Sequence, residues 1–167
     1  MADNPSPVNK LKEKFPASIL DETIFRGEVT LRVAPKDLFE ICRFLYSDPD
    51  LQFRFLTDLC GVDYFSNGPP EGTPRFGVIH LLYSMKNNQR LRLKTRVAEG
   101  QSISSVESIW KAANWLEREV YDLFGVRFDH HPDLRRILLW DGYEGHPLRK
   151  DYPLEGPAFD KPFVPEV

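Results

Sequence analysis

The sequence predicts a two-layer α+β domain with a largely antiparallel sheet, followed by an irregular C-terminal docking arm. Three observations support this prediction. Apolar residues alternate along five segments, as in strands, and recur at helical spacing along four others. The connections between strands are too short for helical crossovers, which favours antiparallel pairing. The predicted order is α-β(2)-α-β(3)-α-α, and the length of 167 residues suits one domain.

The N-terminal segments predict a helix, a hairpin and a second helix. Residues 1–7 are polar and hold two prolines, so we expect a loose start. Apolar residues at helical spacing predict a short helix over 8–15. Two strands within 19–33 are joined at Gly27, which permits the turn of a hairpin. A proline at the first helical position and an i, i+3, i+4, i+7 pattern then predict a helix over 35–48.

Three strands are expected next, over 53–64, 76–85 and 90–97. The apolar phase of the first strand switches at Gly61, which predicts a β-bulge there. The second strand is apolar on both phases, so we expect it to be central and covered on both faces. A Pro/Gly-rich loop over 66–74 joins these two strands.

The third of these strands alternates strictly, so its outward face is wholly basic. That face carries Arg90, Arg92, Lys94 and Arg96. Because the net charge of the chain is −3, binding of nucleic acid is disfavoured. A solvated sheet face is the favoured interpretation, and electrostatic docking to an acidic protein is the alternative that stays open.

Two consecutive helices are predicted after the strands. A Ser–Glu pair with capping-box spacing predicts a helix over about 104–112, and an Asn–Glu pair predicts another over about 115–124, with Gly125 at its C-terminus. Their apolar residues form one broad face. We therefore expect the core domain to be complete within residues 1–125.

The last segment, 126–167, differs from the rest of the chain. It holds six of the 14 prolines and shows no sustained helical or strand period, yet it is rich in aromatic residues and arginine. A disordered tail would be poor in aromatics. An irregular segment of this length and composition usually packs along its own domain or along a partner. We interpret 126–167 as a docking arm.

Several functional classes are disfavoured by the sequence. The longest apolar stretch without charged residues, 76–85, has ten residues, about half of the ~20 that a membrane-spanning helix needs. The N-terminus resembles neither a secretory signal nor a transit peptide, so a reducing cytoplasm is expected. Cys42 and Cys60 form no CxxC pair, and no glycine pattern fits a nucleotide-binding loop, so we expect neither a cysteine-based metal site nor bound NADH.

The histidines and cysteines form no recognisable catalytic pattern. His130, His131 and His146 could bind a metal together with a nearby carboxylate, which would suit a free-standing metal hydrolase. However, adjacent histidines on an extended chain point to opposite sides, and HxxxH and HExxH pairs are absent. Hydrogen-bonded loop histidines are the favoured interpretation, and both cysteines are expected to be small buried residues.

Charged residues crowd the last predicted helix. Glu117 is placed to cap its start, while Arg118 and Asp122 form an i, i+4 pair, worth roughly a few tenths of a kcal/mol. A structural role explains most of these residues. The arm that follows carries basic residues that could hold it to the helix or to a neighbour. These are Arg135, Arg136, Arg149 and Lys150.

The stretch 117–153 resembles the C-terminal signature of the 30 kDa subunit family of respiratory complex I, the bacterial NADH-quinone oxidoreductase. The family pattern begins Glu-Arg-Glu, continues after two residues with an acidic and two apolar residues, and later asks for a basic residue, an arginine and two apolar residues. The matching positions are Glu117, Arg118, Glu119, Asp122, Leu123, Phe124, His131, Arg135, Ile137 and Leu138. The resemblance continues through 145–152 and reaches upstream to about residue 20.

The resemblance implies an α+β subunit that has no cofactor of its own, in the peripheral arm of a proton-translocating NADH:quinone oxidoreductase. Such a subunit packs beside the 49 kDa subunit of the quinone site, while FMN and iron–sulfur clusters in partner subunits carry electrons from NADH to quinone. The resemblance implies no catalytic, cofactor-binding or metal-binding residue here. It implies an interface role for Glu117, Arg118, Glu119, Asp122, His131, Arg135, Arg136, Arg149, Lys150 and Asp151.

We therefore expect a structural and assembly subunit that is inactive when isolated. Partner subunits would hold it at the cytoplasmic side of a bacterial inner membrane, without contact with nucleic acid. Two alternatives stay open: the equivalent scaffold subunit of a related membrane-bound hydrogenase or dehydrogenase, and the free-standing metal hydrolase.

Overall fold

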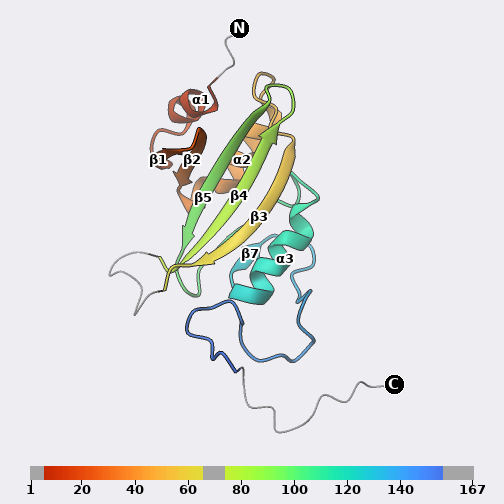
Figure 1. Ribbon diagram of the computed structural model, residues 1–167. Coiled ribbons are helices and arrows are strands. Elements are labelled where there is room, and N and C mark those ends of the chain that lie inside the picture. Colours follow the sequence, from red (N-terminus) through yellow and green to blue (C-terminus); the bar gives the residue numbers. More distant parts are fainter. Residues whose placement is uncertain (1–5, 66–73, 156–167) are drawn as a thin grey trace.

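The computed structural model describes residues 6–65 and 74–155, which form a five-stranded sheet with helices packed on one face (Figure 1). The strands are β1 (Ile19–Phe25), β2 (Glu28–Val33), β3 (Phe55–Asp63), β4 (Phe76–Ser84) and β5 (Gln89–Val97). Their spatial order is β1-β2-β5-β4-β3, and neighbours are antiparallel except for the parallel pair β2 and β5. The predicted α+β class with a largely antiparallel sheet is confirmed.

The predicted N-terminal helix and hairpin are present. Helix α1 (Pro7–Lys14) begins where the Ser6 hydroxyl accepts a hydrogen bond from the N–H of Asn9 at 3.3 Å. The turn between β1 and β2 places Gly27 at φ +79°, a left-handed conformation that glycine adopts easily. Of the residues 1–7 expected to be loose, 1–5 lie outside the described residues and Pro7 already belongs to α1.

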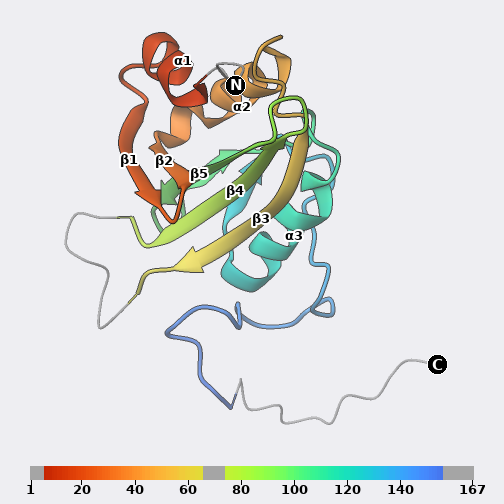
Figure 2. The same ribbon diagram turned by 45° about the horizontal axis from the view of Figure 1, so that its top comes forward.

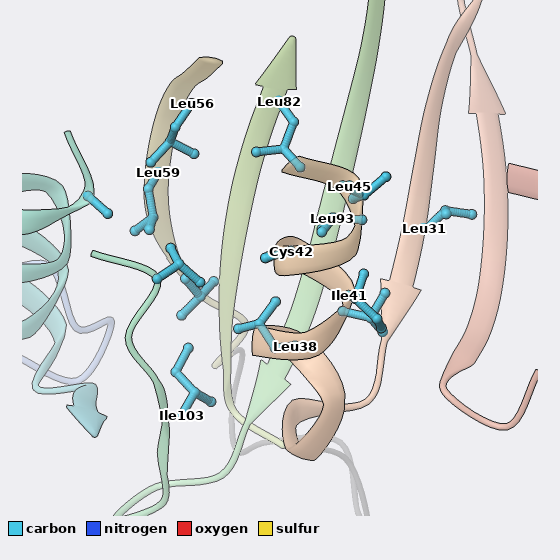
Figure 3. Packing of buried hydrophobic residues seen from close by; sticks show 14 of the residues in the cluster. Leu31, Leu38, Ile41, Cys42, Leu45, Leu56, Leu59, Leu82, Leu93 and Ile103 are labelled. Carbon is cyan, nitrogen blue, oxygen red and sulfur yellow. The ribbon is translucent and has the colours of Figure 1, made fainter. Parts of the chain in front are cut away.

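The second helix covers the inner face of the sheet. A short 3-10 helix, η1 (Pro35–Asp37), leads into α2 (Leu38–Ser47). Figure 3 shows the apolar side chains of α2 among those of the strands. The fully buried residues of α2 are Leu38, Ile41, Cys42 and Leu45. Burying a large apolar side chain contributes roughly 1.5–3 kcal/mol, so this contact is a main source of stability.

The β-bulge in β3 lies at Thr57 and not at Gly61 as predicted. The register against β4 shifts between Leu56 and Asp58, so Leu56 points into the core while Phe55 stays 46% exposed. Gly61 has a different role. A Cβ atom there would lie 2.6 Å from the ring of Phe124, so the glycine allows a helix to approach the sheet closely.

Strand β4 is apolar on both phases, but helices cover only one of its faces. Its inner residues, such as Val78 and Leu82, are buried, while Ile79 and Leu81 on the other face are half-buried. Within residues 6–65 and 74–155, the expected cover of the second face is not found. The strict alternation of β5 is confirmed, with leucines inward and basic side chains outward. Most of the predicted loop over 66–74 lies outside the described residues.

The first of the two predicted C-terminal helices does not form. Its segment contains β6 (Ser102–Ser104) followed by turns, and a single helix, α3 (Ala113–Phe124), comes next. Strand β6 pairs in parallel with β7 (Arg127–Asp129), and the N–H of Ser105 donates to the carbonyl of Asp129 at 2.9 Å. This pairing holds Ser104, the expected first residue of that helix, in an extended strand.

The core also extends beyond the expected boundary at residue 125. Val126 and Phe128 are buried with the residues of α3 and the sheet, and β7 lies in the segment that was assigned to the arm. The irregular part therefore begins after Asp129. From here on, the C-terminal arm means residues 130–155.

Candidate interface of helix α3 and the C-terminal arm

The C-terminal arm folds back on its own domain. In Figure 2 it is coloured blue and passes below the end of α3. It contains turns but no helix or strand. Its position therefore depends on hydrogen bonds of side chains and on hydrogen bonds to the last carbonyls of α3. Three groups of contacts hold it: one around Asp122, one at the C-terminus of α3, and one around Arg75.

The first anchor is the carboxylate of Asp122, whose side chain is fully buried. Its Oδ1 accepts a hydrogen bond from the guanidinium of Arg136 at 2.7 Å. Its Oδ2 accepts three bonds of 2.8–3.0 Å from the consecutive N–H groups of residues 137–139. Burial disfavours the charge, but these four hydrogen bonds outweigh it and hold the pKa of Asp122 below its ordinary value.

Arg136 also fixes a more distant part of the arm. Its second terminal nitrogen donates to the carbonyls of Tyr143, at 2.8 Å, and Gly145, at 3.1 Å. One guanidinium therefore joins α3 to two separate arm segments. Such a planar fork with several donors suits arginine and not lysine.

The second anchor caps the C-terminus of α3, where the last carbonyls lack partners within the helix. The carbonyl of Asp122 accepts from His146 Nδ1 at 2.8 Å, that of Leu123 from the N–H of Leu148 at 3.1 Å, and that of Phe124 from Arg149 Nε at 2.7 Å. Because His146 Nδ1 donates here, its hydrogen lies on that nitrogen. The arm thus supplies the hydrogen-bond donors that the last carbonyls of α3 lack.

The third anchor is a nearly buried ion pair between Arg75 and Asp63, at the end of β3 and the start of β4. Two guanidinium nitrogens of Arg75 donate to the two oxygens of Asp63 at 3.0 and 2.8 Å. The same guanidinium donates to Asp151 of the arm at 2.5 and 3.0 Å, and the N–H of Lys150 donates to Asp63 at 2.9 Å. The Arg75 guanidinium also lies over the rings of Phe65 and Phe76, 4.7 and 4.9 Å from their centroids.

Contrary to the prediction, Glu117 does not cap the start of its own helix. Its fully buried carboxylate accepts a hydrogen bond from the hydroxyl of Ser105 at 2.6 Å and one from the N–H of Val106 at 2.8 Å, and so stabilises the turn after β6. Burial raises the pKa of Glu117 from 4.5 to about 7, although these two bonds act in the opposite direction. The side chain of His131 lies 3.9 Å away.

His131 and His146 make structural hydrogen bonds, whereas the ring nitrogens of His80 have no hydrogen-bond partner among the described residues. His131 Nδ1 accepts from the N–H of Asp133 at 3.0 Å, so its Nε2 donates to the carbonyl of Asn114 at 3.0 Å. His80 in β4 is fully buried, and burial lowers its pKa to about 4. In the part of the chain that the structure describes, no three His, Cys, Asp or Glu side chains are grouped as a metal site requires.

The two cysteines differ in their surroundings. Cys42 is fully buried on α2 as predicted, and burial raises the pKa of its thiol. Cys60 is only half-buried, so the expectation of a buried residue is wrong there.

The remaining signature residues fall into two groups. Arg118 donates from α3 to the carbonyls of Arg135 and Arg136, at 3.1 and 3.0 Å, and so joins the anchors. Glu119 and the side chains of Arg135 and Lys150 are exposed. Arg135 pairs only with its neighbour Asp133, at 2.9 Å.

The sequence did not indicate Asp63 or Arg75, whereas the prediction that Gly125 ends the last helix is confirmed. Arg75 and Asp63 lie on either side of the long loop, and neither forms a local motif, so only their place in the fold relates them to the arm. Gly125 did carry a signal, as the residue after a helix, and it adopts φ +77°. A Cβ there would also lie 2.5 Å from Arg149, so the glycine leaves room for the arm.

The anchors leave large apolar side chains facing outward. Trp115 and Asp122 are two turns apart on one face of α3, and residues 135–139 run along this face. Trp115 is 70%, Leu138 62% and Trp140 47% exposed. Together with exposed Glu119 and Arg135, these three residues define what we call the α3–arm surface. Clustered exposed apolar residues with polar neighbours are typical of protein interaction sites.

Residues 31–158 match the model of one protein family, described as the respiratory-chain NADH dehydrogenase 30 Kd subunit. The chain is 57% identical over 158 residues to the C subunit of the NADH-quinone oxidoreductase of Geobacter sulfurreducens, with 94% of each chain covered. It is 42% identical over 153 residues to the C subunit of the same enzyme from Roseiflexus castenholzii, covering 91% of this chain and 85% of that one.

Two solved structures have a similar fold. One is Nqo5, solved as a trypsin-resistant fragment (1-134), with a TM-score of 0.64, 28% identity, and coverage of 77% of this chain and all of that one. The other is a chain of an archaeal membrane-bound sulfane sulfur reductase, with a TM-score of 0.71, 21% identity and 96% of each chain covered, which shows a likeness of fold. Among the described residues, no helix has the length and apolar character needed to cross a membrane.

Proposed function

We propose a structural role for this chain, which belongs to the family of the respiratory-chain NADH dehydrogenase 30 kDa subunit. In this role, its α3–arm surface binds a partner within that complex. Its relatives are C subunits of NADH-quinone oxidoreductases. In this proposal the chain lies in the peripheral arm of the complex and packs beside the 49 kDa subunit. FMN and iron–sulfur clusters belong to other subunits, and partner subunits hold this chain at the cytoplasmic side of the inner membrane.

One observation carries the proposal beyond family membership: the buried signature residues hold an irregular arm in place while its apolar side chains stay exposed. Asp122 and Arg136 fix residues 136–139, and Leu138 and Trp140 remain on the outside. An arm fixed in this way loses little conformational entropy when it binds, which favours tight association. The signature residues thus act as positioning residues for the α3–arm surface.

The signature residues divide into those that stabilise this chain's own structure and those proposed to contact a partner. Glu117, Arg118, Asp122, His131, Arg136, Arg149 and Asp151 hold the chain's own structure together. Asp151 is exposed, but its carboxylate accepts from Arg75. Glu119, Arg135 and Lys150 are the other exposed members, and we propose direct partner contacts for these three. An obligate interface of this kind buries roughly 2,000 Å² or more.

Fractionation and assay of the purified chain test the proposal. We expect an alkaline or chaotropic wash of membranes to release the chain, because partner contacts alone hold it there. We expect the purified chain to show no NADH oxidation, no visible cofactor absorbance and no stoichiometric iron or zinc. Retention of the chain in the membrane after both washes, with release only by detergent, would contradict the structural role. One equivalent of any of these three signals would also contradict it.

A further inference from the structure

A second surface lies on the outer face of the sheet, opposite to α2. It is a groove of about 860 Å³ formed by β1, β2, β4 and β5 and the segments beside them. This face is turned toward the viewer in Figure 1, and no helix in the described ranges covers it. Its lining combines apolar side chains such as Leu20, Phe25 and Ile79 with four basic residues. These are Arg32, Arg92, Lys94 and Arg96.

The basic residues of the groove are poorly neutralised by the chain itself. Arg92 pairs with Glu28 at 2.8 Å. Within the described residues, Arg32, Lys94 and Arg96 have no carboxylate within ion-pair distance. Lys94 and Arg96 instead lie over the ring of Tyr64, 4.7 and 3.4 Å from its centroid.

The register of the sheet makes this arrangement unfavourable for the isolated domain. Arg32 of β2 and Lys94 of β5 are direct cross-strand partners, so two like charges face each other. Like charges at such positions destabilise a sheet. Asp21 of β1 is opposite Arg32 and lines the groove, yet no ion pair joins them. A chain with a net charge of −3 thus concentrates positive charge in one groove.

The strand beside the groove is also open. β1 is an edge strand, and Leu20, Ile24 and Phe25 are 49%, 66% and 66% exposed. An exposed, apolar edge is normally covered by another chain or protected by charge. Apolar side chains next to unpaired cations fit an acidic protein segment better than a nucleic acid, which would require a larger positive surface.

We propose that this groove binds an acidic segment of another subunit, whose carboxylates meet Arg32, Lys94 and Arg96 and whose apolar side chains cover Leu20 and Phe25. The identity of the partner rests on the proposed function, because it is a subunit of the same complex. The groove and the α3–arm surface are separate: α3 packs on the inner face beside β3, whereas the groove lies on the outer face near β1. Each can therefore be tested alone.

The test reverses charge in the groove of the full chain, expressed with a tag in place of the native subunit. The groove variant combines Arg32→Glu and Lys94→Glu. The control combines Arg54→Glu and Arg127→Glu, which change the net charge equally at exposed arginines outside the groove. We expect the groove variant to recover at least about tenfold less of the other subunits from detergent-solubilised membranes, because opposed like charges weaken an interface strongly. The control should stay within about twofold of the wild type.

A photo-crosslinking residue at Thr23, an exposed residue of the groove lining, identifies the occupant. The expected product is a peptide of another subunit with at least two carboxylates, and replacing these by lysine should restore assembly of the groove variant. Circular dichroism melting checks that both variants fold.

The outcomes separate the two proposals. Suppose that the wild type recovers the other subunits. The groove inference alone is then wrong if the groove variant recovers them equally well, or if cross-links from Thr23 form only to lipid, nucleic acid or a second copy of the chain. If the wild type recovers no subunit of the complex, the proposed function fails, and the groove inference fails with it.

Discussion

Arg135 and Arg136 are neighbours in the sequence, but the structure predicts very different effects when each is replaced by alanine. Arg136→Ala removes the positive partner of Asp122, a carboxylate with no exposed side-chain surface, together with two bonds to arm carbonyls. Breaking a buried pair by removing one partner costs about 3–5 kcal/mol. Since 19% of the Arg136 side chain is exposed, we expect the lower end, about 3 kcal/mol.

Arg135→Ala is the matched control. The Arg135 side chain is 71% exposed and pairs only with Asp133, itself 50% exposed. Such surface pairs contribute about 0–1 kcal/mol, so the variant should unfold nearly like the wild type. Because Arg135 belongs to the α3–arm surface, its loss should reduce assembly instead.

Thermal unfolding of the purified chain measures both effects. In a chain of this size, a loss of 1 kcal/mol lowers Tm by about 2–4 °C, so Arg136→Ala should lower Tm by about 6–12 °C and Arg135→Ala by at most about 4 °C. Equal Tm values for the two variants would refute the Asp122 anchor. They would show that the arm is not part of the folded unit.

Three further variants test individual contacts. Glu117 has a folded-state pKa of about 7 against an ordinary 4.5, so the folded chain holds a proton that the unfolded chain releases, and stability should fall as pH rises through that window. Measured by urea unfolding, the free energy of unfolding of the wild type should fall by roughly 3 kcal/mol between pH 4.5 and 8 relative to that of Glu117→Gln. The same pH dependence of the unfolding free energy in both proteins would exclude a raised pKa. Gly61→Ala should cost about 1–3 kcal/mol through overlap with Phe124, whereas an unchanged denaturation midpoint would mean that α3 does not pack there. Gly125→Ala should lower Tm more than Gly142→Ala, because both glycines have positive φ but only Gly125 faces Arg149 and His146; equal losses would leave backbone strain as the sole cause.

Sequence periodicity predicted the elements whose structure depends on near neighbours. Helix α2 and strand β5 bury apolar residues at regular spacing, and this spacing is visible in the sequence. The prediction failed where a distant segment decides the conformation. Residues 102–104 form a strand because β7 pairs with them, and β7 lies beyond the helix that follows.

The same limit applies to the candidate interface. The sequence identified the charged residues of α3 and the arm, but not which of them are buried. Arg75 and Asp151 are 76 positions apart and meet only because the arm returns to the start of β4. Adjacent Arg135 and Arg136 look equivalent in the sequence, while the structure gives a buried partner to Arg136 alone.

Co-purification tests the central claim most directly. The tagged chain is recovered from detergent-solubilised membranes of the organism that carries it, and the bound proteins are identified and quantified. We expect the subunits of an NADH-quinone oxidoreductase in near one-to-one amounts, with cross-links from Trp115, Leu138 or Trp140 to the 49 kDa subunit. Recovery of the chain alone, or with the subunits of a different enzyme, would contradict the account.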